Sequence, residues 1–381
     1  EYLEIDFHPE LTVLIAPNGS GKTTVLDAAR AALWPYVKGF DLGNQTGKGA
    51  TIQIADVRLA PKPDGNMEPQ LPSAIEALGH WDALSPERPW LQSRERVAPK
   101  TNTLGDKNTK QLTKFAGQLE QQVRSTSNQV TLPLISYLGT SRLWFEGRFT
   151  SIAEDVALNT SDYSRTSGYL NCLSYSSSFK AFTAWYGWIF RSYREEQIEA
   201  IEKGGSLEEV GQRYATIIKV IQSVVDTLVT DATGWHRLEY KASQNQQLVM
   251  HHDEFGSMPV DMLSDGLRNA IAMVADLAFR AYKLNPHLGE GAPQRTPGVA
   301  LIDEVDMFLH PSWQQTIIAS LRKAFPLIQF IVTTHSPQVL STVPRENIRI
   351  LEQDDTGSRA RMPDFSPLAH ESGDALAKVM G

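Results

Sequence analysis

The feature that most constrains this chain is a glycine-rich loop between an apolar run and a helix-favouring stretch. The loop is residues 16–23, APNGSGKT; the apolar run before it is residues 11–15, and the helical stretch covers residues 22–33. Strand, loop and helix in this order are the setting in which the pattern G-x-x-x-x-G-K-[ST] holds the phosphates of a nucleotide. Ala16 stands at the first glycine of the pattern, where its methyl group removes no phosphate ligand. The loop therefore predicts a triphosphate site in an α/β sheet.

Each residue type in this loop has a use at such a site. Gly19 and Gly21 let the backbone turn its N–H groups toward the phosphates. The Lys22 ammonium reaches the β and γ oxygens, and the Thr23 hydroxyl is a ligand for Mg²⁺. The alternative is a glycine-rich connection whose lysine is only solvated. We predict that ATP is contacted by Asn18, Gly19, Ser20, Gly21, Lys22, Thr23 and Thr24.

A second motif is the run VALIDEVD, residues 299–306, which ends an apolar strand with the carboxylates of Asp303 and Glu304. The carboxyl ends of strands are where α/β sheets place their ligands. We predict that Asp303 holds Mg²⁺ together with Thr23. Glu304 is predicted to polarise the water that attacks the γ-phosphate. The alternative is an acidic pair that caps the following helix.

A histidine ends another apolar strand, in the run FIVTTHSP of residues 330–337. A lone histidine is most often a structural residue. Because His335 follows the acidic strand in the chain, its imidazole is predicted to donate to the γ-phosphate and to act in catalysis with Glu304.

The run LSDG, residues 263–266, opens a long helical pattern. A hydroxyl from Ser264 and free backbone N–H groups near Gly266 would face an anion at the start of that helix. A serine before a helix is more often a simple N-cap, so the two interpretations stay open on this motif alone.

Taken together, the loop, a long insertion, LSDG, LIDEVD and the histidine resemble the ABC ATPase superfamily in its SMC-like and RecF-like branch. The resemblance implies an α/β fold: an ABC-type P-loop ATPase head with a mixed sheet and a compact, mainly helical insertion. It implies that Ser264 and Gly266 of one protomer close over ATP held by Lys22 and Thr23 of another. A head-to-tail homodimer or higher oligomer is therefore expected, with ATP and Mg²⁺ as cofactors.

Four further runs are similar to the ATPase subunits of Septu-type anti-phage systems, which also occur as retron effectors. These runs are LPLISYLGTSRLW, DEVDMFLHPSWQQ, THSPQVL and ESGDALAKVMG. The resemblance implies a partner HNH nuclease and, in a retron, a reverse transcriptase with its RNA-DNA product. No nuclease motif stands out in this chain. We therefore predict an ATPase that regulates a nuclease in defence.

The pattern of the chain predicts three segments. Residues 1–60 form an N-terminal lobe of the head with the glycine-rich loop. Residues 61–255 form an insertion with a basic loop and a helical subdomain, of which residues 130–145 return to the head. Residues 256–381 form a C-terminal lobe with LSDG, the acidic strand and the histidine. Within the insertion we expect residues 60–128 to be largely loop, and residues 179–203 and 207–229 to be helical.

Composition limits the partners. The formal net charge of −8 argues against nucleic-acid binding over the whole surface, although a local basic patch could still contact phosphates. The single cysteine suits a reducing compartment. No apolar run approaches the roughly 20 residues that cross a bilayer, so we expect a cytoplasmic protein with no membrane partner. The chain starts at Glu1 without methionine, and we expect that a strand precedes it.

Two other functions remain open. One is a DNA-repair or chromosome-maintenance ATPase that binds DNA directly, and the other is a scaffold that binds ATP without hydrolysing it. Direct binding of nucleic acid would need a basic groove, which only residues 94–114 suggest. The cations of that region are Arg94, Arg96, Lys100, Lys107, Lys110 and Lys114.

Overall fold

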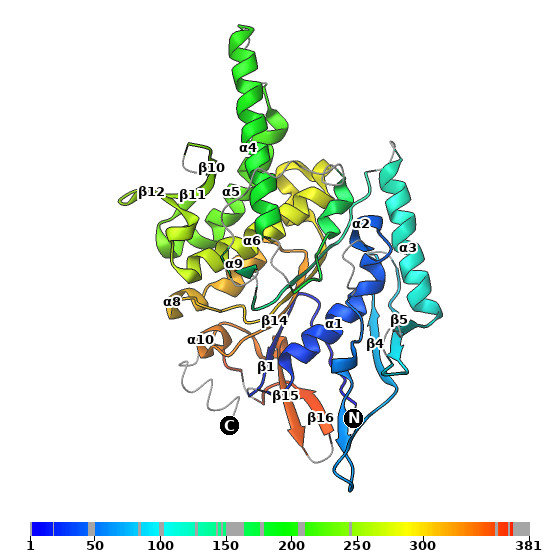
Figure 1. Ribbon diagram of the computed structural model, residues 1–381. Coiled ribbons are helices and arrows are strands. Elements are labelled where there is room, and N and C mark those ends of the chain that lie inside the picture. The colour runs from blue at the N-terminus through cyan, green and yellow to red at the C-terminus, as the bar shows by residue number, and fades with distance from the viewer. Residues whose placement is uncertain are drawn as a thin grey trace. The chain divides into compact units, whose positions relative to one another are not determined.

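The apolar strands form a six-stranded sheet in the computed structural model of the chain (Figure 1). β1 and β7 are buried along their whole lengths, because parallel strands covered on both faces need no polar alternation. Four neighbouring pairs are parallel, and β15 and β16 pair antiparallel, so the sheet is mixed. The strand order is β16-β15-β1-β14-β13-β7, with β1 Leu11–Ile15, β7 Leu134–Leu138, β13 Gly298–Ile302, β14 Ile328–Thr333, β15 Ile348–Asp354 and β16 Gly357–Arg361.

The chain divides into two units. The first unit comprises Glu1–Lys22, Thr131–Gly168 and Tyr175–Gly381, and it contains the six-stranded sheet. The second unit comprises Thr23–Val130 and Tyr169–Ser174. The structure describes residues 2–17, 19–44, 50–82, 85–98, 103–125, 129–141, 144–145, 148–149, 164–175, 179–204, 210–243, 246–354, 357–364 and 366–368.

Three long helices pack together in the first unit. They are α4 Phe179–Glu202, α5 Gln212–Thr233 and α6 Asp265–Leu284, and contacts join α5 to both of the others. The two helices predicted in the insertion are thereby confirmed. α5 begins after Gly211, whose φ of 64° lies in the left-handed region where glycine is favoured. The apolar side chains of Ile217, Ile221 and Leu228 on this helix are buried, whereas residues 205–209 lie outside the described chain.

An aromatic cluster fills the space between α4 and α6. Trp185 lies 4.6 Å from Phe279 between ring centroids, and Phe182 lies 5.3 Å from Tyr186. The Tyr186 hydroxyl donates to the carbonyl of Leu238 at 3.0 Å, which satisfies the buried hydroxyl. The helices are therefore held by packing and by a polar bond to the small sheet that follows α5.

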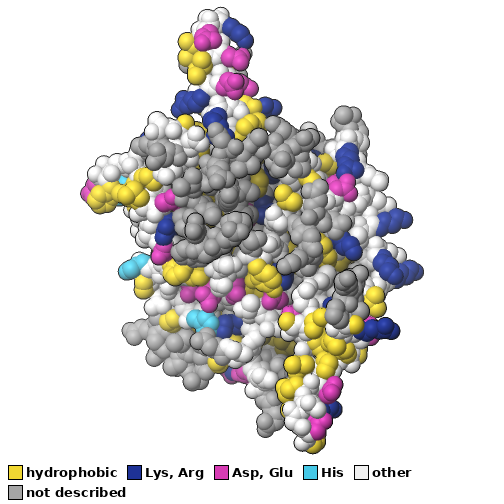
Figure 2. Space-filling view, in the orientation of Figure 1, with side chains coloured by type: hydrophobic (Ala, Val, Ile, Leu, Met, Phe, Trp, Pro, Cys, Tyr) yellow, Lys and Arg dark blue, Asp and Glu magenta, His cyan; other side chains and the backbone are white. Residues whose placement is uncertain are grey.

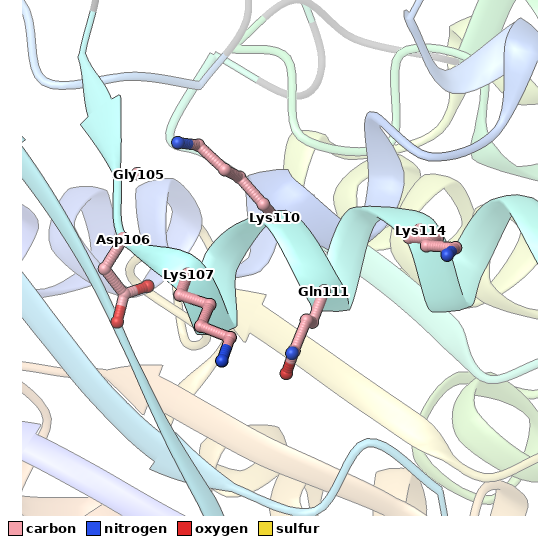
Figure 3. Close-up of a pocket in the computed structure, with 6 residues that line it drawn as sticks. All are labelled: Gly105, Asp106, Lys107, Lys110, Gln111 and Lys114. Carbon is pink, nitrogen blue, oxygen red and sulfur yellow. The ribbon is translucent and has the colours of Figure 1, made fainter.

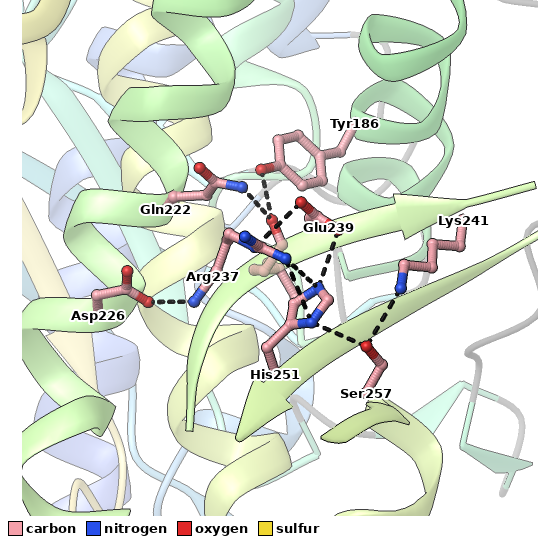
Figure 4. Close-up of polar contacts among 9 residues, drawn as sticks. Tyr186, Gln222, Asp226, Arg237, Glu239, Lys241, His251 and Ser257 are labelled. Carbon is pink, nitrogen blue, oxygen red and sulfur yellow. Dashed lines mark hydrogen bonds and ion pairs between the residues drawn. The ribbon is translucent and has the colours of Figure 1, made fainter. Parts of the chain in front are cut away.

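That small sheet consists of β10 His236–Lys241, β11 Gln247–His252 and β12 Gly256–Pro259, paired antiparallel. One chain of hydrogen bonds crosses its three strands (Figure 4). The His251 ring lies 2.9 Å from the Glu239 carboxylate and 2.8 Å from the Ser257 hydroxyl. The backbone N–H of Arg237 donates to Asp226 on α5 at 2.8 Å, so the sheet is also tied to the helix.

The second unit corrects the expectation that residues 60–128 are largely loop. The region contains five short strands and an 18-residue helix, α3. The prediction relied on a composition rich in Pro, Gly and polar residues. It overlooked apolar residues at helical spacing, which are Leu112, Phe115, Ala116 and Leu119. These elements are β2 Leu59–Pro61, β3 Met67–Pro69, β4 Ser73–Gly79, β5 Arg88–Arg94, β6 Leu104–Gly105 and α3 Lys107–Arg124.

Side chains of β5 bind the backbone of α1 Lys22–Val37, which follows the glycine-rich loop. The Trp90 indole donates to the carbonyl of Ala32 at 2.8 Å, and the Gln92 amide donates to that of Ala31 at 2.6 Å. Both donors are buried, so each bond satisfies a group that would otherwise be costly to bury.

The remaining elements are short. They are the helices α2 Asp41–Asn44, α7 Ala292–Arg295, α8 Pro311–Gln314, α9 Ile317–Ala324 and α10 Pro337–Leu340, the 3-10 turns Ile54–Asp56, Arg165–Tyr169, Val260–Met262, Pro286–Gly291 and Arg345–Asn347, and the strands β8 Trp144–Phe145 and β9 Arg148–Phe149. Within the described ranges, no helix has the length and apolar character needed to pass through a membrane.

Candidate nucleotide site

The register of the main sheet brings the predicted motifs to one edge. Leu14 of β1 pairs with Thr333 of β14, and Val332 pairs with Ile302 of β13. These strands are parallel, so their carboxyl ends lie side by side, where ligands bind in α/β sheets. The glycine-rich loop leaves β1 at this edge, the acidic pair leaves β13, and His335 follows β14.

The glycine-rich loop has the backbone that the sequence suggests. Gly19 has a φ of 80° and Gly21 a φ of 86°, both in the left-handed region that side chains other than glycine rarely adopt. No heavy atom lies within 4 Å of the point where a Cβ on Gly19 would stand, so the loop has open space beside it. Asn18 lies outside the described residues, and the contacts of the loop with ATP stay a prediction.

The Lys22 ammonium is held by its own loop. It donates to the carbonyl of Ala16 at 2.7 Å and to that of Pro17 at 3.2 Å. Burial lowers the pKa of Lys22 below its ordinary value, and the negative charges of Asp303 and Glu304 act in the opposite direction. The structure thus places the loop lysine within the electrostatic reach of both predicted carboxylates.

One threonine bonds the side chain of Asp303 and the backbone of Glu304. The Thr333 hydroxyl donates to Asp303 Oδ1 at 2.5 Å and accepts the backbone N–H of Glu304 at 2.8 Å. Asp303 is buried, while Glu304 is half-buried and has a φ of 48°. A residue other than glycine in this region stores strain, which often marks a functional position. Thr333 was not among the residues predicted from the sequence, although the pair of threonines before His335 was a signal for it.

Thr23 and Thr24 form the first turn of α1, and both are exposed. They follow Lys22 directly in the chain and belong to the second unit. Their roles, toward Mg²⁺ for Thr23 and toward ATP for both, stay predictions.

His335 stands between two anchored neighbours. The Thr334 hydroxyl donates to Asp306 and accepts the backbone N–H of Ser336 at 2.9 Å. The Ser336 hydroxyl donates to the Gln314 side chain at 2.6 Å and accepts the N–H of Val339 at 3.2 Å. These bonds fix the backbone on both sides of a half-buried imidazole. Such support would suit a residue that must hold a defined direction toward a ligand.

The LSDG segment does begin a long helix. Ser264 is the N-cap of α6, and its exposed hydroxyl accepts the N–H of Leu267 at 3.4 Å, which is long for a hydrogen bond. A Cβ on Gly266 would stand 2.4 Å from the carbonyl oxygen of Phe308, and the Asn269 amide donates to Met307 at 2.8 Å. The helix start is therefore packed against the loop that follows Asp303 and Glu304. Ser264 therefore caps its own helix, and its predicted contact with ATP on a second protomer stays a prediction.

The oxygen donors at this edge fit Mg²⁺. This ion usually binds through one or two carboxylates together with substrate phosphates rather than in an all-protein cage. In the described part of the chain, no group of three or more His, Cys, Asp or Glu could hold a metal ion. Asp303, with Thr23 as a hydroxyl donor, is the set that the sequence predicts.

Comparison with known families and relatives shows what the chain is similar to. The family described as "AAA domain, putative AbiEii toxin, Type IV TA system" matches residues 134–341. The "Retron Vc95 probable ATPase" of Vibrio cholerae serotype O1 biovar El Tor is 28% identical over 399 residues, covering 96% of this chain and 73% of that protein. The "Septu protein PtuA" of Bacillus mycoides (strain KBAB4) is 40% identical over 75 residues, 20% of this chain and 10% of that protein.

A solved structure shows the same fold. The Smc head domain with an extended coiled coil, bound to the C-terminal domain of ScpA and derived from Pyrococcus furiosus, superposes with a TM-score of 0.51. The match covers 94% of this chain and 91% of that chain at 14% identity. The predicted fold class, a P-loop ATPase head with a mixed sheet and a helical insertion, is thereby confirmed.

Proposed function

This chain belongs to the AAA-domain family that matches residues 134–341, as an ABC/SMC-like ATPase, and we propose that it binds and hydrolyses ATP to regulate a partner nuclease in anti-phage defence. The names of its relatives, a retron probable ATPase and a Septu protein, support the defence role. The proposed partners are an HNH nuclease and, in a retron setting, a reverse transcriptase with its RNA-DNA product.

The proposal depends on one observation, the approach of the loop lysine to the acidic strand. Lys22 lies near the start of the chain and the two carboxylates lie near its end, yet the charges of Asp303 and Glu304 act on the Lys22 ammonium. A P-loop lysine beside a strand-ending acidic pair is the arrangement that phosphoryl transfer from ATP requires.

Each group has a distinct part in the proposed reaction. The Lys22 ammonium would exchange the carbonyls of Ala16 and Pro17 for phosphate oxygens of ATP. Glu304, whose backbone is held by Thr333, would accept the proton of the attacking water. His335 would donate a hydrogen bond to the γ-phosphate. Mg²⁺, when bound by Asp303 and Thr23, would neutralise charge on the phosphates.

A second copy of the chain is proposed to complete the site through Ser264 and Gly266. The surface around the α6 N-cap supports this. Met262 is 72% exposed and Phe308 is 57% exposed, although both are large apolar side chains. Large exposed apolar side chains are a feature of surfaces that a partner covers. The exposed Ser264 hydroxyl lies in the same segment as Met262.

Calorimetry with ATP and Mg²⁺ tests the nucleotide site. Replacing Lys22 by Ala removes charge-assisted hydrogen bonds worth about 1.5–3 kcal/mol, so we expect the Kd for ATP to rise roughly 10- to 100-fold. Lys219→Ala is the control, because Lys219 pairs with Glu290 on the surface and is expected to leave the Kd unchanged. Equal affinities of wild type and Lys22→Ala would reject the site.

Two further measurements separate hydrolysis and partnership from binding. Phosphate release by the wild type, measured at saturating ATP, is expected; binding without release would instead fit a nucleotide-dependent scaffold. Purification of the tagged protein from cells that express its own operon is expected to recover a nuclease. Recovery of the ATPase without any nuclease would contradict the regulatory role.

A further inference from the structure

Helix α3 in the second unit exposes a row of lysines. Lys107, Lys110 and Lys114 are all exposed, and together with Gly105, Asp106 and Gln111 they line a hollow of about 350 Å³ (Figure 3). We call the surface formed by Lys107, Lys110, Gln111 and Lys114 the lysine face. Figure 2 shows Lys and Arg side chains gathered over α3.

The lysine face carries positive charge that no ion pair among the described residues neutralises. In the described part of the chain, none of its three lysines forms an ion pair, whereas Arg124 at the other end of α3 pairs with Asp41 and Glu120. Glu120 is buried, and its carboxylate accepts the backbone N–H of Asp41 at 3.1 Å.

Asp106 is the nearby exception to this positive charge. As the N-cap of α3, its carboxylate accepts the N–H of Thr109 at 2.7 Å and that of Leu91 at 3.3 Å. Its charge is therefore directed into the helix start. On a chain with a net charge of −8, three exposed lysines on one helix make a local basic surface that the overall composition does not indicate.

The spacing of the lysines favours an extended polyanion over a single phosphate. Seven residues separate Lys107 from Lys114, which is about 10 Å along a helix axis. Lys107 and Gln111 extend to one side of α3 while Lys110 extends to the other (Figure 3). Because the ammonium groups spread apart, one small anion would not contact all of them, whereas a row of phosphates would.

We propose that the lysine face binds the phosphate backbone of a nucleic acid. The contact itself depends only on α3, and its use in controlling a defence nuclease rests on the proposed function. The site is narrower than the basic region predicted from residues 94–114. Arg94 is buried and donates to the carbonyl of Ile52 at 2.9 Å, so it does not belong to the surface. Lys100 lies outside the described residues.

Fluorescence anisotropy tests the proposal, with a labelled DNA duplex and the matching single strand titrated over a range of salt concentrations. Phosphate contacts release counterions, so log Kobs falls with log salt by about 0.9 per contact on duplex and about 0.7 on single strands. The combined variant Lys107→Gln, Lys110→Gln and Lys114→Gln is expected to weaken binding and to reduce this slope by about 2 to 3. The form of nucleic acid that loses more binding identifies the ligand.

The matched control removes lysines that already have partners. Lys203 pairs with Glu199 and Lys219 with Glu290, so Lys203→Gln combined with Lys219→Gln is expected to keep the wild-type slope. Circular dichroism and thermal melting of both variants check that they fold. Because glutamine is a good helix former, α3 is expected to remain intact.

Three outcomes would overturn the proposal. The first is a lysine-face variant whose salt slope equals that of the wild type. The second is a control variant whose salt slope falls as much as that of the lysine-face variant. The third is tighter binding of a labelled polyglutamate peptide than of either DNA, with the same dependence on the three lysines, which would assign the face to an acidic protein. Lys22→Ala is expected to leave DNA binding without ATP unchanged, so failure of the nucleotide site is measured separately.

Discussion

Lys22 and the lysines of the lysine face carry the same kind of charged group, an ammonium, but Lys22 is buried and the lysines of α3 are exposed. Lys22 is buried, donates to two carbonyls of its own loop, and is influenced by Asp303 and Glu304. The lysines of α3 stand in water with no ion-pair partner in the described chain. A buried cation with fixed partners can recognise the shape of a ligand. An exposed cation recognises mainly charge, and salt screens it within about a Debye length. The two surfaces are therefore suited to different ligands.

The largest effect at the buried site is expected from Glu304→Gln. A general base contributes about 10²- to 10⁴-fold to rate, so ATP turnover is expected to fall by that factor while ATP binding is retained. Phosphate release at saturating ATP, with calorimetry on the same preparation, measures both. Glu290→Gln, which alters a surface pair with Lys219, is expected to leave turnover unchanged. Normal turnover in Glu304→Gln would remove Glu304 from the reaction.

The next test asks whether buried charges here require their partners. Arg280 and Asp276 on α6 form a 2.8 Å ion pair with both side chains 2% exposed, and Arg280 also donates to the carbonyl of Gly168 at 2.7 Å. Arg280→Met leaves Asp276 buried without its main cation, and we expect a loss of about 3–5 kcal/mol in the free energy of unfolding. Urea denaturation measures it.

Two controls sharpen that result. The double variant Arg280→Met with Asp276→Leu is expected to recover much of the stability, because apolar replacement of a whole buried pair is often neutral. Lys110→Gln on the lysine face is expected to change stability by less than about 0.5 kcal/mol. If Arg280→Met lowered the free energy of unfolding as little as Lys110→Gln, buried and exposed charges would not differ in their need for partners.

A smaller effect is expected from Gly266→Ala at the start of α6. The new Cβ would meet the carbonyl oxygen of Phe308 at 2.4 Å, so the helix and the loop after Glu304 must separate. Overpacking of this kind costs about 1–3 kcal/mol. Gly117→Ala on α3 is the matched control, because its Cβ would meet the Gly39 carbonyl oxygen at an ordinary 3.5 Å.

Thermal melting of these two glycine variants measures the difference. Alanine is favoured over glycine in a helix by about 0.5–1 kcal/mol, so Gly117→Ala is expected to be neutral or stabilising. Equal melting temperatures for Gly266→Ala and the wild type would show that the close approach at Phe308 is relieved without cost.

The smallest effect is expected at Asp226, which accepts the N–H of Arg237 (Figure 4). Burial raises the pKa of this carboxyl above its ordinary 3.8, and the bond from Arg237 opposes the rise. A raised native pKa stabilises the fold below the unfolded pKa, and this stabilisation is lost as pH rises through the native pKa. Asp226→Asn is expected to lack that decline.

Urea denaturation across a pH series compares Asp226→Asn with Asp226→Ala. The amide keeps an oxygen acceptor for Arg237, whereas alanine removes it and is expected to cost about 1 kcal/mol at every pH. Equal losses in the two variants would mean that the carboxylate charge, rather than the hydrogen bond, supports the link between α5 and β10.

Short local patterns allowed much of this molecule to be predicted. The apolar runs before the glycine-rich loop and before Asp303 form buried strands, and the periodic stretches form α4 and α5. Ser264 opens a helix as expected. The prediction for residues 60–128 was wrong because composition was weighed above the helical period of Leu112 and Ala116.

The sequence by itself determined the class of fold and the candidate residues, because a glycine-rich turn, a strand-ending acidic pair and an N-cap are signals contained within a few neighbouring residues. Only the tertiary structure decided which of them meet. Thr333 lies 30 residues from the Asp303 that it binds, and Phe308 lies far along the chain from Gly266. The tertiary structure also decided which basic side chains of residues 94–114 are buried and which are exposed, because burial depends on the elements that pack against them.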